Sequence, residues 1–139
     1  MARRRLFVDT NVFLRFLTRD DPAKAEDCRA LFQRAEQGEV DLVINDMVVA
    51  ELVWTLRSYY RLPKQEVVES VRDILGMRSL RIPRKALLLE ALGLYESLNV
   101  DFIDAYNAFD SRRKGVDGVC SYDEDFDRLS TFRVEPGSI

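Results

Sequence analysis

The sequence predicts an α/β fold, a single domain in which a central parallel β-sheet of four to five strands carries helices on both faces. Short apolar segments typical of buried strands alternate along the chain with longer segments whose apolar residues recur at helical spacing. Their order is strand, helices, strand, helices, strand, helices, strand and strand, an alternation typical of parallel sheets. The sequence contains no repeat, no low-complexity segment and no convincing linker, so we expect one domain over residues 1–139.

The first predicted strand is the apolar run over residues 6–8, which we expect to be covered on both faces, as strands of parallel sheets usually are. Asp9, Thr10 and Asn11 follow, and apolar residues then recur at helical spacing, so a helix begins at once. All three polar residues are good helix N-caps. Asp9 therefore has two interpretations, a helix cap or a functional carboxylate at the strand edge where ligands of open α/β sheets bind.

The middle of the chain repeats this pattern. We predict helices over residues 23–37, 47–60, 64–75 and 83–98, and strands over 40–44 and 80–82. Pro22 in a first helical turn and Gly38 after a last one mark the bounds of the first of these helices.

Glu51 lies one turn into the helix predicted over 47–60, away from the middle of its apolar stripe. By itself it is typical of an exposed helix carboxylate. Its helix follows a strand end, however, which allows Glu51 to lean over the same sheet edge as Asp9. The aromatic residues of this helix are expected to be core or subunit contacts rather than a surface on which bases stack: Trp54, Tyr59 and Tyr60.

A further helix is predicted over residues 101–114. Asp101 fits its N-cap and Asp104 the third helical position, so the pair is either a variant of the capping box or a functional site. The small residues Ala105 and Ala108 follow, and they allow another element to approach this helix closely. That feature favours a functional Asp104.

The chain closes with a predicted strand over 116–120, a short capped helix and a last strand over 132–135. Ser121 and a run of acidic residues begin the short helix directly after a strand end. Asp123 is nearest the strand edge and is the predicted site residue, with Asp125 as its alternate.

The composition excludes several kinds of site. The chain has 139 residues and no histidine, which rules out Ser-His-Asp and Cys-His catalysis and argues against zinc. Cys28 and Cys120 are far apart, and we expect free thiols in a cytoplasmic protein. The net charge of −3 is unlike that of a typical nucleic-acid binder but is compatible with acids gathered around a cation. No apolar run is long enough for a membrane span, and residues 1–5 lack the apolar stretch of a signal peptide, so no membrane association is expected.

Four carboxylates are expected near one sheet edge: Asp9, Glu51, Asp104 and Asp123. Hard cations such as Mg²⁺ or Mn²⁺ take oxygen ligands, and they hydrolyse phosphodiesters by activating water and neutralising the phosphate. Crowded carboxylates repel one another, so a cluster of this kind costs stability unless a cation relieves it. We therefore interpret the chain as a metal-dependent nuclease.

The sequence resembles PIN-domain ribonucleases of the VapC-like toxin type over essentially its whole length. Four segments carry the resemblance: Val8-Asp9-Thr10-Asn11, Ala50-Glu51-Leu52, Asp101-Phe102-Ile103-Asp104-Ala105 and Ser121-Tyr122-Asp123-Glu124-Asp125-Phe126. The first and third are fairly specific when they occur together in this order, whereas the second is weak alone. Ser121 stands where threonine is usual, and Tyr122 is bulkier than many residues at its position.

The resemblance implies that Asp9, Glu51, Asp104 and Asp123 hold Mg²⁺ or Mn²⁺, with support from Thr10, Asn11, Ser121 and Asp125. It implies hydrolysis of single-stranded RNA, a homodimeric toxin and a small antitoxin protein that covers the acidic groove. Whether Asp101 or Asp125 joins the site stays open.

Three other functions are compatible with parts of the pattern. A PIN-like domain that binds RNA or protein without cutting would be expected to lack one of the four acids, and all four are present. An RNA-processing nuclease that is not a toxin fits the same residues. A phosphotransfer domain fits less well, because Asn11 occupies the position of the second aspartate of dehalogenase-like phosphatases, and no lysine follows Cys120-Ser121 as in a receiver.

Overall fold

The computed structural model describes residues 3–139, which divide between Lys85 and Ala86 into two compact units. Met1 and Ala2, at the start of the N-terminal segment that we expect not to be a signal peptide, lie outside the described residues. The first unit contains β1 (Arg4–Phe7), α1 (Thr10–Thr18), α2 (Pro22–Glu36), β2 (Val40–Val43), α3 (Asp46–Ser58), α4 (Lys64–Leu75) and β3 (Leu80–Arg81). The second contains α5 (Lys85–Ser97), which begins at the boundary, α6 (Phe102–Arg113), β4 (Val119–Cys120), the 3₁₀ helix η1 (Glu124–Leu129), β5 (Arg133–Val134) and η2 (Pro136–Ser138). None of the described helices is both long and apolar enough to span a membrane.

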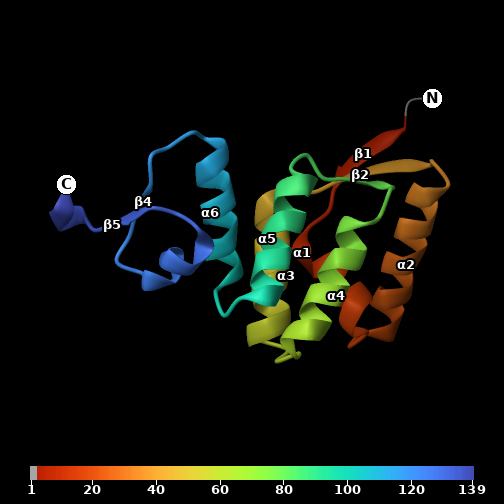
Figure 1. Ribbon diagram of the computed structural model, residues 1–139. Helices are drawn as coiled ribbons and strands as arrows, with labels where there is room; N and C mark the ends of the chain where they lie inside the picture. The colour runs from red at the N-terminus through yellow and green to blue at the C-terminus, as the bar shows by residue number, and fades with distance from the viewer. Residues whose placement is uncertain (1–2) are drawn as a thin grey trace. The chain divides into compact units, whose positions relative to one another are not determined.

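A parallel sheet with the strand order β1-β2-β3 forms the first unit together with α1 to α4 (Figure 1). Phe7 pairs with Val43 at the carboxyl ends of β1 and β2. The ladder continues one step further, because the Val8 amide donates to the Val43 carbonyl over 2.9 Å. Helices α1 and α3 begin directly after these strand ends, so the N-termini of both helices lie at the same edge of the sheet.

Capping and apolar periodicity explain where the helices of this unit begin and which faces they bury. The Asp21 side chain accepts a hydrogen bond from the Lys24 amide at the start of α2, and Asn45 accepts one from the Val48 amide at the start of α3, each over 3.1 Å. The apolar residues of α4 that recur at helical spacing are fully buried: Val67, Val68, Val71 and Leu75.

The second unit packs η1 against α6 and pairs β4 with β5 in parallel (Figure 1). Gly118 allows this pairing, because a Cβ atom there would lie 2.4 Å from the Phe132 carbonyl oxygen. The Val119 amide donates to that same carbonyl over 2.7 Å. The loop between β4 and η1 contains the last predicted acidic segment, so this pairing positions it.

The α/β class and the parallel strands confirm the predicted fold class, with two differences. The five strands form a three-stranded sheet and a separate two-stranded sheet rather than one continuous sheet. The expectation that the first strand is covered on both faces is wrong, since β1 is at the edge of its sheet, Leu6 is only partly buried and the Phe7 side chain is 58% exposed. Single-domain extent over residues 1–139 stays a prediction.

Two side-chain expectations have different outcomes. Cys28 and Cys120 are free thiols, as expected. Of the two placements expected for Trp54 and Tyr59, the core is wrong, because their side chains are 65% and 73% exposed, and a subunit contact stays a prediction. The inward positions of this helix are already filled by aliphatic residues, so its aromatic rings are left outside.

Candidate metal centre

Three carboxylates of the second unit lie close together. Asp104, Asp123 and Asp125 each offer an oxygen atom, and these three oxygens lie within 4.8 Å of one another. Asp104 and Asp123 are two of the four predicted ligands, and Asp125 was predicted as a supporting residue. Asp125 belongs to this cluster and Asp101 does not, and which of them joins a metal site stays a prediction.

Asp104 is the third residue of α6, and the start of this helix is not a capping box. Asp101 occupies the N-cap, yet its side chain makes no cap hydrogen bond. The interpretation of Asp101 and Asp104 as a purely structural pair is therefore not realised in the structure. Asp104 is partly buried, with Phe102 and Ala105 fully buried beside it in the sequence.

A tight turn after β4 brings the other two acids together. The Asp123 amide donates to Ser121 Oγ over 2.9 Å, and the Asp125 amide donates to Asp123 Oδ1 over 2.9 Å. These local bonds hold the chain in the conformation from which η1 starts. Ser121 therefore orients the backbone of Asp123, and its supporting role at a metal site stays a prediction.

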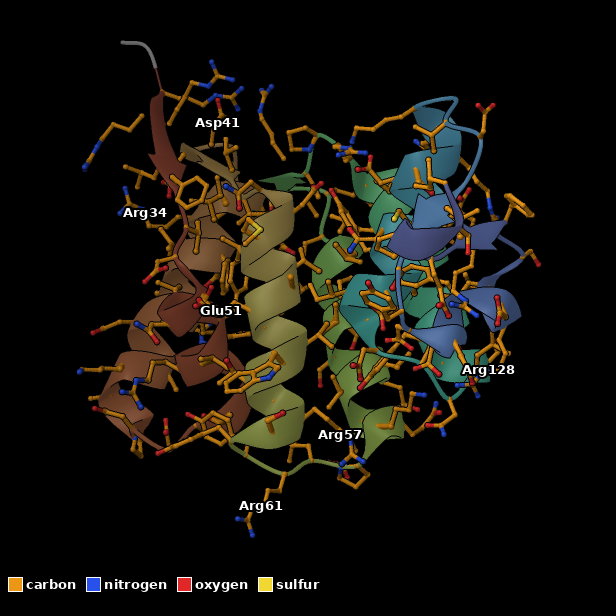
Figure 2. The ribbon with its side chains drawn as sticks, turned by 90° about the vertical axis from the view of Figure 1, so that its left-hand side faces the viewer. Arg34, Asp41, Glu51, Arg57, Arg61 and Arg128 are labelled. Carbon is orange, nitrogen blue, oxygen red and sulfur yellow. The ribbon has the colours of Figure 1, made fainter. Side chains whose placement is uncertain are left out.

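Arg128 is a member of the site's surroundings that the sequence reasoning missed. Arg128 lies one turn after Asp125 in η1 and forms an ion pair with the Asp125 carboxylate. Figure 2 labels Arg128. The signal was present as an acid and a base three residues apart at the start of a predicted helix. In the metal-free protein this guanidinium offsets part of the negative charge of the cluster.

The environment of the cluster shifts the pKa of Asp104. The pKa of its carboxyl is raised from 3.8 to about 6, first by partial burial and then by the neighbouring carboxylates of Asp123, Asp101 and Asp125 in that order. A hydrogen bond with Asp123 acts in the same direction. Negative charge is therefore crowded here beyond what Arg128 neutralises. An all-oxygen donor set with this excess charge fits a hard divalent cation.

A groove of about 520 Å³ adjoins the cluster within the second unit. Asp104 and Phe126 form part of its wall, together with Asn107 and Ser111 from the next two turns of α6 and Cys120 from β4. Polar groups thus continue from the acidic cluster along the face of the helix. The groove gives a substrate room beside the carboxylates.

Asp9 lies in the first unit, at the strand edge where the sequence predicts it. It occupies the N-cap of α1, but its side chain makes no cap hydrogen bond. The Asp9 side chain is exposed, and within residues 3–139 no hydrogen bond or ion pair holds its carboxylate. The capping interpretation of Asp9 is therefore not realised. Thr10 beside it is 2% exposed, whereas Asn11 is exposed.

Glu51 also belongs to the first unit, in the second turn of α3. Figure 2 shows it on the side of α3 toward the N-terminal segment of the chain, and its side chain is exposed. In the described part of the chain no cation pairs with it. The four predicted ligands are thus divided between the units, with Asp9 and Glu51 in the first and Asp104 and Asp123 in the second.

Comparison with known proteins identifies the family of this chain. Residues 6–131 match the sequence model of the PIN domain. The chain belongs to the PIN-domain family. It is also similar to a VapC ribonuclease from Aquifex aeolicus (strain VF5), with 27% identity over 129 residues that cover 93% of this chain and 95% of the relative. The PIN match includes all four predicted ligands and the whole of the acidic cluster.

Proposed function

We propose that this PIN-domain protein is an endoribonuclease that hydrolyses phosphodiester bonds of single-stranded RNA with the help of Mg²⁺ or Mn²⁺. The observation that carries the proposal is the cluster of Asp104, Asp123 and Asp125, in which partial burial and the neighbouring carboxylates raise the pKa of Asp104 to about 6. In a nuclease, an acidic cluster of this kind can bind the cation that hydrolysis needs. In a protein that binds no cation, the repulsion between the same carboxylates would only lower stability. The similarity to a protein named VapC ribonuclease supports the same activity.

In this proposal Asp104 and Asp123 hold the cation together with Asp9 and Glu51, and Asp125 supports them. When bound, the cation would polarise the scissile phosphate and lower the pKa of a coordinated water. Asp9 and Glu51 are suited to this role because neither carboxylate is engaged by a cap or a cation within residues 3–139.

The supporting residues act by orienting these ligands. Ser121 accepts from the Asp123 amide over 2.9 Å and so fixes the turn that presents Asp123. Arg128 holds Asp125 and keeps part of the charge neutral before the cation arrives. Thr10 and Asn11 flank Asp9 and are proposed to orient its carboxylate.

We further propose the biological setting of a toxin–antitoxin module. The similarity to the Aquifex VapC ribonuclease supports it, and the implied partner is a small antitoxin protein that covers the acidic groove of a homodimeric toxin in the cytoplasm. A single PIN domain over residues 1–139 is part of this proposal. Tight inhibition by a co-expressed antitoxin distinguishes a toxin from an RNA-processing nuclease with the same chemistry.

The test of the proposed activity is cleavage of labelled single-stranded RNAs by the purified protein, with Mg²⁺, with Mn²⁺ and with excess EDTA. We expect cleavage with either cation and none in EDTA. Cleavage that continues in EDTA would contradict the metal-dependent mechanism. RNA binding without cleavage, in a preparation that mass analysis shows to be free of an inhibitor, would favour the non-catalytic binding function.

Cation binding should depend on pH because a proton competes for Asp104. The pKa of this carboxyl is about 6, so the affinity for Mn²⁺ should increase by roughly tenfold between about pH 5 and pH 7. Isothermal titration calorimetry at several pH values measures the Mn²⁺ affinity, together with the proton released on binding. An affinity that does not change across this range would show that Asp104 is not a ligand.

A further inference from the structure

Helix α3 carries a line of exposed side chains that we call the α3 stripe: Met47, Glu51, Trp54 and Arg57. Their spacing of four, three and three residues keeps them on one side of the helix. The buried residues of this helix are Val48, Val49, Leu52, Val53 and Leu56. The packing of the first unit is therefore complete without the stripe.

Trp54 is the most unusual member of the stripe. It is the single tryptophan of the chain, and its side chain is 65% exposed. Met47, two turns earlier on the same side, is 73% exposed. Tryptophan is usually well buried, and a large exposed aromatic surface is a common sign of a binding site.

Two arginines continue the stripe beyond Trp54. Arg57 Nη1 donates to the Leu62 carbonyl over 3.2 Å, which steadies the guanidinium and leaves its other N–H groups available. Arg61 is exposed and has a left-handed backbone, with φ of 57°. Figure 2 shows both labels at the end of α3 below Glu51. In the described part of the chain neither arginine forms an ion pair, whereas Arg29 is paired with Glu26.

We propose that Trp54 stacks on a base of the RNA substrate and that Arg57 and Arg61 contact its phosphates. The inference rests on the proposed function, in which Glu51 helps hold the cation at the scissile phosphate. Trp54 follows Glu51 by three residues, a rise of about 4.5 Å along the helix, so a base next to that phosphate reaches the indole ring. Arg57 follows after a further turn, where the backbone of the same strand continues.

The composition of the stripe favours RNA over an apolar protein surface. Glu51 lies between Met47 and Trp54, and no cation of residues 3–139 pairs with it. A protein that covered both apolar residues would also bury this carboxylate, at a large desolvation cost. An RNA strand that arrives with its divalent cations neutralises Glu51 instead. Aromatic stacking combined with nearby arginines is the usual way in which single strands are bound.

The experiment uses Trp54 as its own reporter. We would titrate the wild-type full chain with a single-stranded RNA analogue whose phosphodiester bonds cannot be hydrolysed, in Mg²⁺. Stacking of a base should quench the emission of the one tryptophan in a saturable way. Unchanged emission at RNA concentrations that saturate an independent binding assay would overturn the proposal.

Steady-state cleavage by single variants in the otherwise wild-type chain provides the second measurement. Trp54→Ala should raise KM by about tenfold, with Trp54→Phe between it and the wild type. Tyr59→Ala is the matched aromatic control, because Tyr59 is 73% exposed but lies at the C-cap of α3, outside the stripe. Arg57→Ala should raise KM several-fold and reduce the salt dependence of binding by about one counterion, whereas Arg29→Ala should not.

The outcomes separate this proposal from the activity itself. If the wild type cleaves RNA and Trp54→Ala has an unchanged KM, the stacking proposal is wrong and the nuclease stands. If the wild type cleaves nothing, the proposed activity fails, and the fluorescence titration still decides whether Trp54 binds RNA. A change of oligomeric state in Trp54→Ala without RNA quenching would assign the stripe to a protein interface and overturn the proposal.

Discussion

Replacement of Asp104 by Asn should reduce RNA cleavage by about a thousandfold or more, while the metal-free protein becomes more stable. The loss of cleavage follows because a lost cation ligand removes about 4 kcal/mol of transition-state stabilisation, which corresponds to that factor in rate. The gain in stability follows because the folded protein partly buries the Asp104 carboxylate and crowds it with the carboxylates of Asp123, Asp101 and Asp125. The amide keeps the shape of the side chain and removes the repulsion.

The sign of the stability effect follows from the two pKa values. The pKa of Asp104 is about 6 in the folded protein against an ordinary 3.8, so ionisation is less favourable in the folded state. The contribution of Asp104 to the stability of the folded protein is therefore fully present below about pH 4 and is lost as the pH rises through about 6. Near pH 7.5 the variant should be more stable than the wild type by about 1–3 kcal/mol, and near pH 4 the difference should vanish.

Thermal unfolding in EDTA at both pH values measures this difference. Asp117→Asn is the matched control, since it removes an exposed aspartate of the same unit that lies outside the cluster, and it should change neither cleavage nor stability. An Asp104→Asn variant that is less stable than the wild type near pH 7.5 would show that the carboxylate serves the fold.

Replacement of Asp9 by Ala should abolish cleavage with almost no effect on stability. Its position at the N-cap of α1 would normally make this substitution costly, but the Asp9 side chain makes no cap hydrogen bond. Only its favourable interaction with the helix dipole is lost, which we expect to cost no more than about 0.5 kcal/mol.

Asp21→Ala provides the opposite case at the N-cap of α2. The Asp21 side chain accepts from the Lys24 amide over 3.1 Å, so its loss should cost about 1 kcal/mol of stability and leave cleavage intact. Cleavage and urea unfolding of the two variants give the comparison. If Asp9→Ala is as destabilised as Asp21→Ala and still cuts RNA, Asp9 is a structural residue.

The helix pattern was predictable because local signals agree with packing in most of the chain. Helix α4 occupies residues Lys64–Leu75, as the apolar spacing and the following Gly76 predict. The exposure of Phe7 was not predictable in the same way. An apolar run is compatible with any strand, and only the sheet order shows that β1 is at an edge.

The acidic site was predictable as a set of residue types but not as a geometry. Asp125 joins Asp104 and Asp123 because a hydrogen bond from the Asp125 amide to Asp123 Oδ1 shapes the turn before η1. Helical or strand periodicity does not describe such a turn. The α3 stripe was missed for a related reason, because Trp54 was expected to be a core or subunit contact although aliphatic residues fill the inner side of α3.

The most direct test of the central claim is to locate the bound cation in the wild-type protein. Fe²⁺ in place of Mg²⁺, with ascorbate and peroxide, generates hydroxyl radicals that cut the polypeptide backbone near the metal. The account predicts cuts close to Asp104 and within residues 121–125, together with cuts near Asp9 and Glu51, all suppressed by excess Mg²⁺ and by Asp104→Asn. Cuts confined to other segments, or cuts that persist in Asp104→Asn, would contradict the assignment of this cluster as the metal centre.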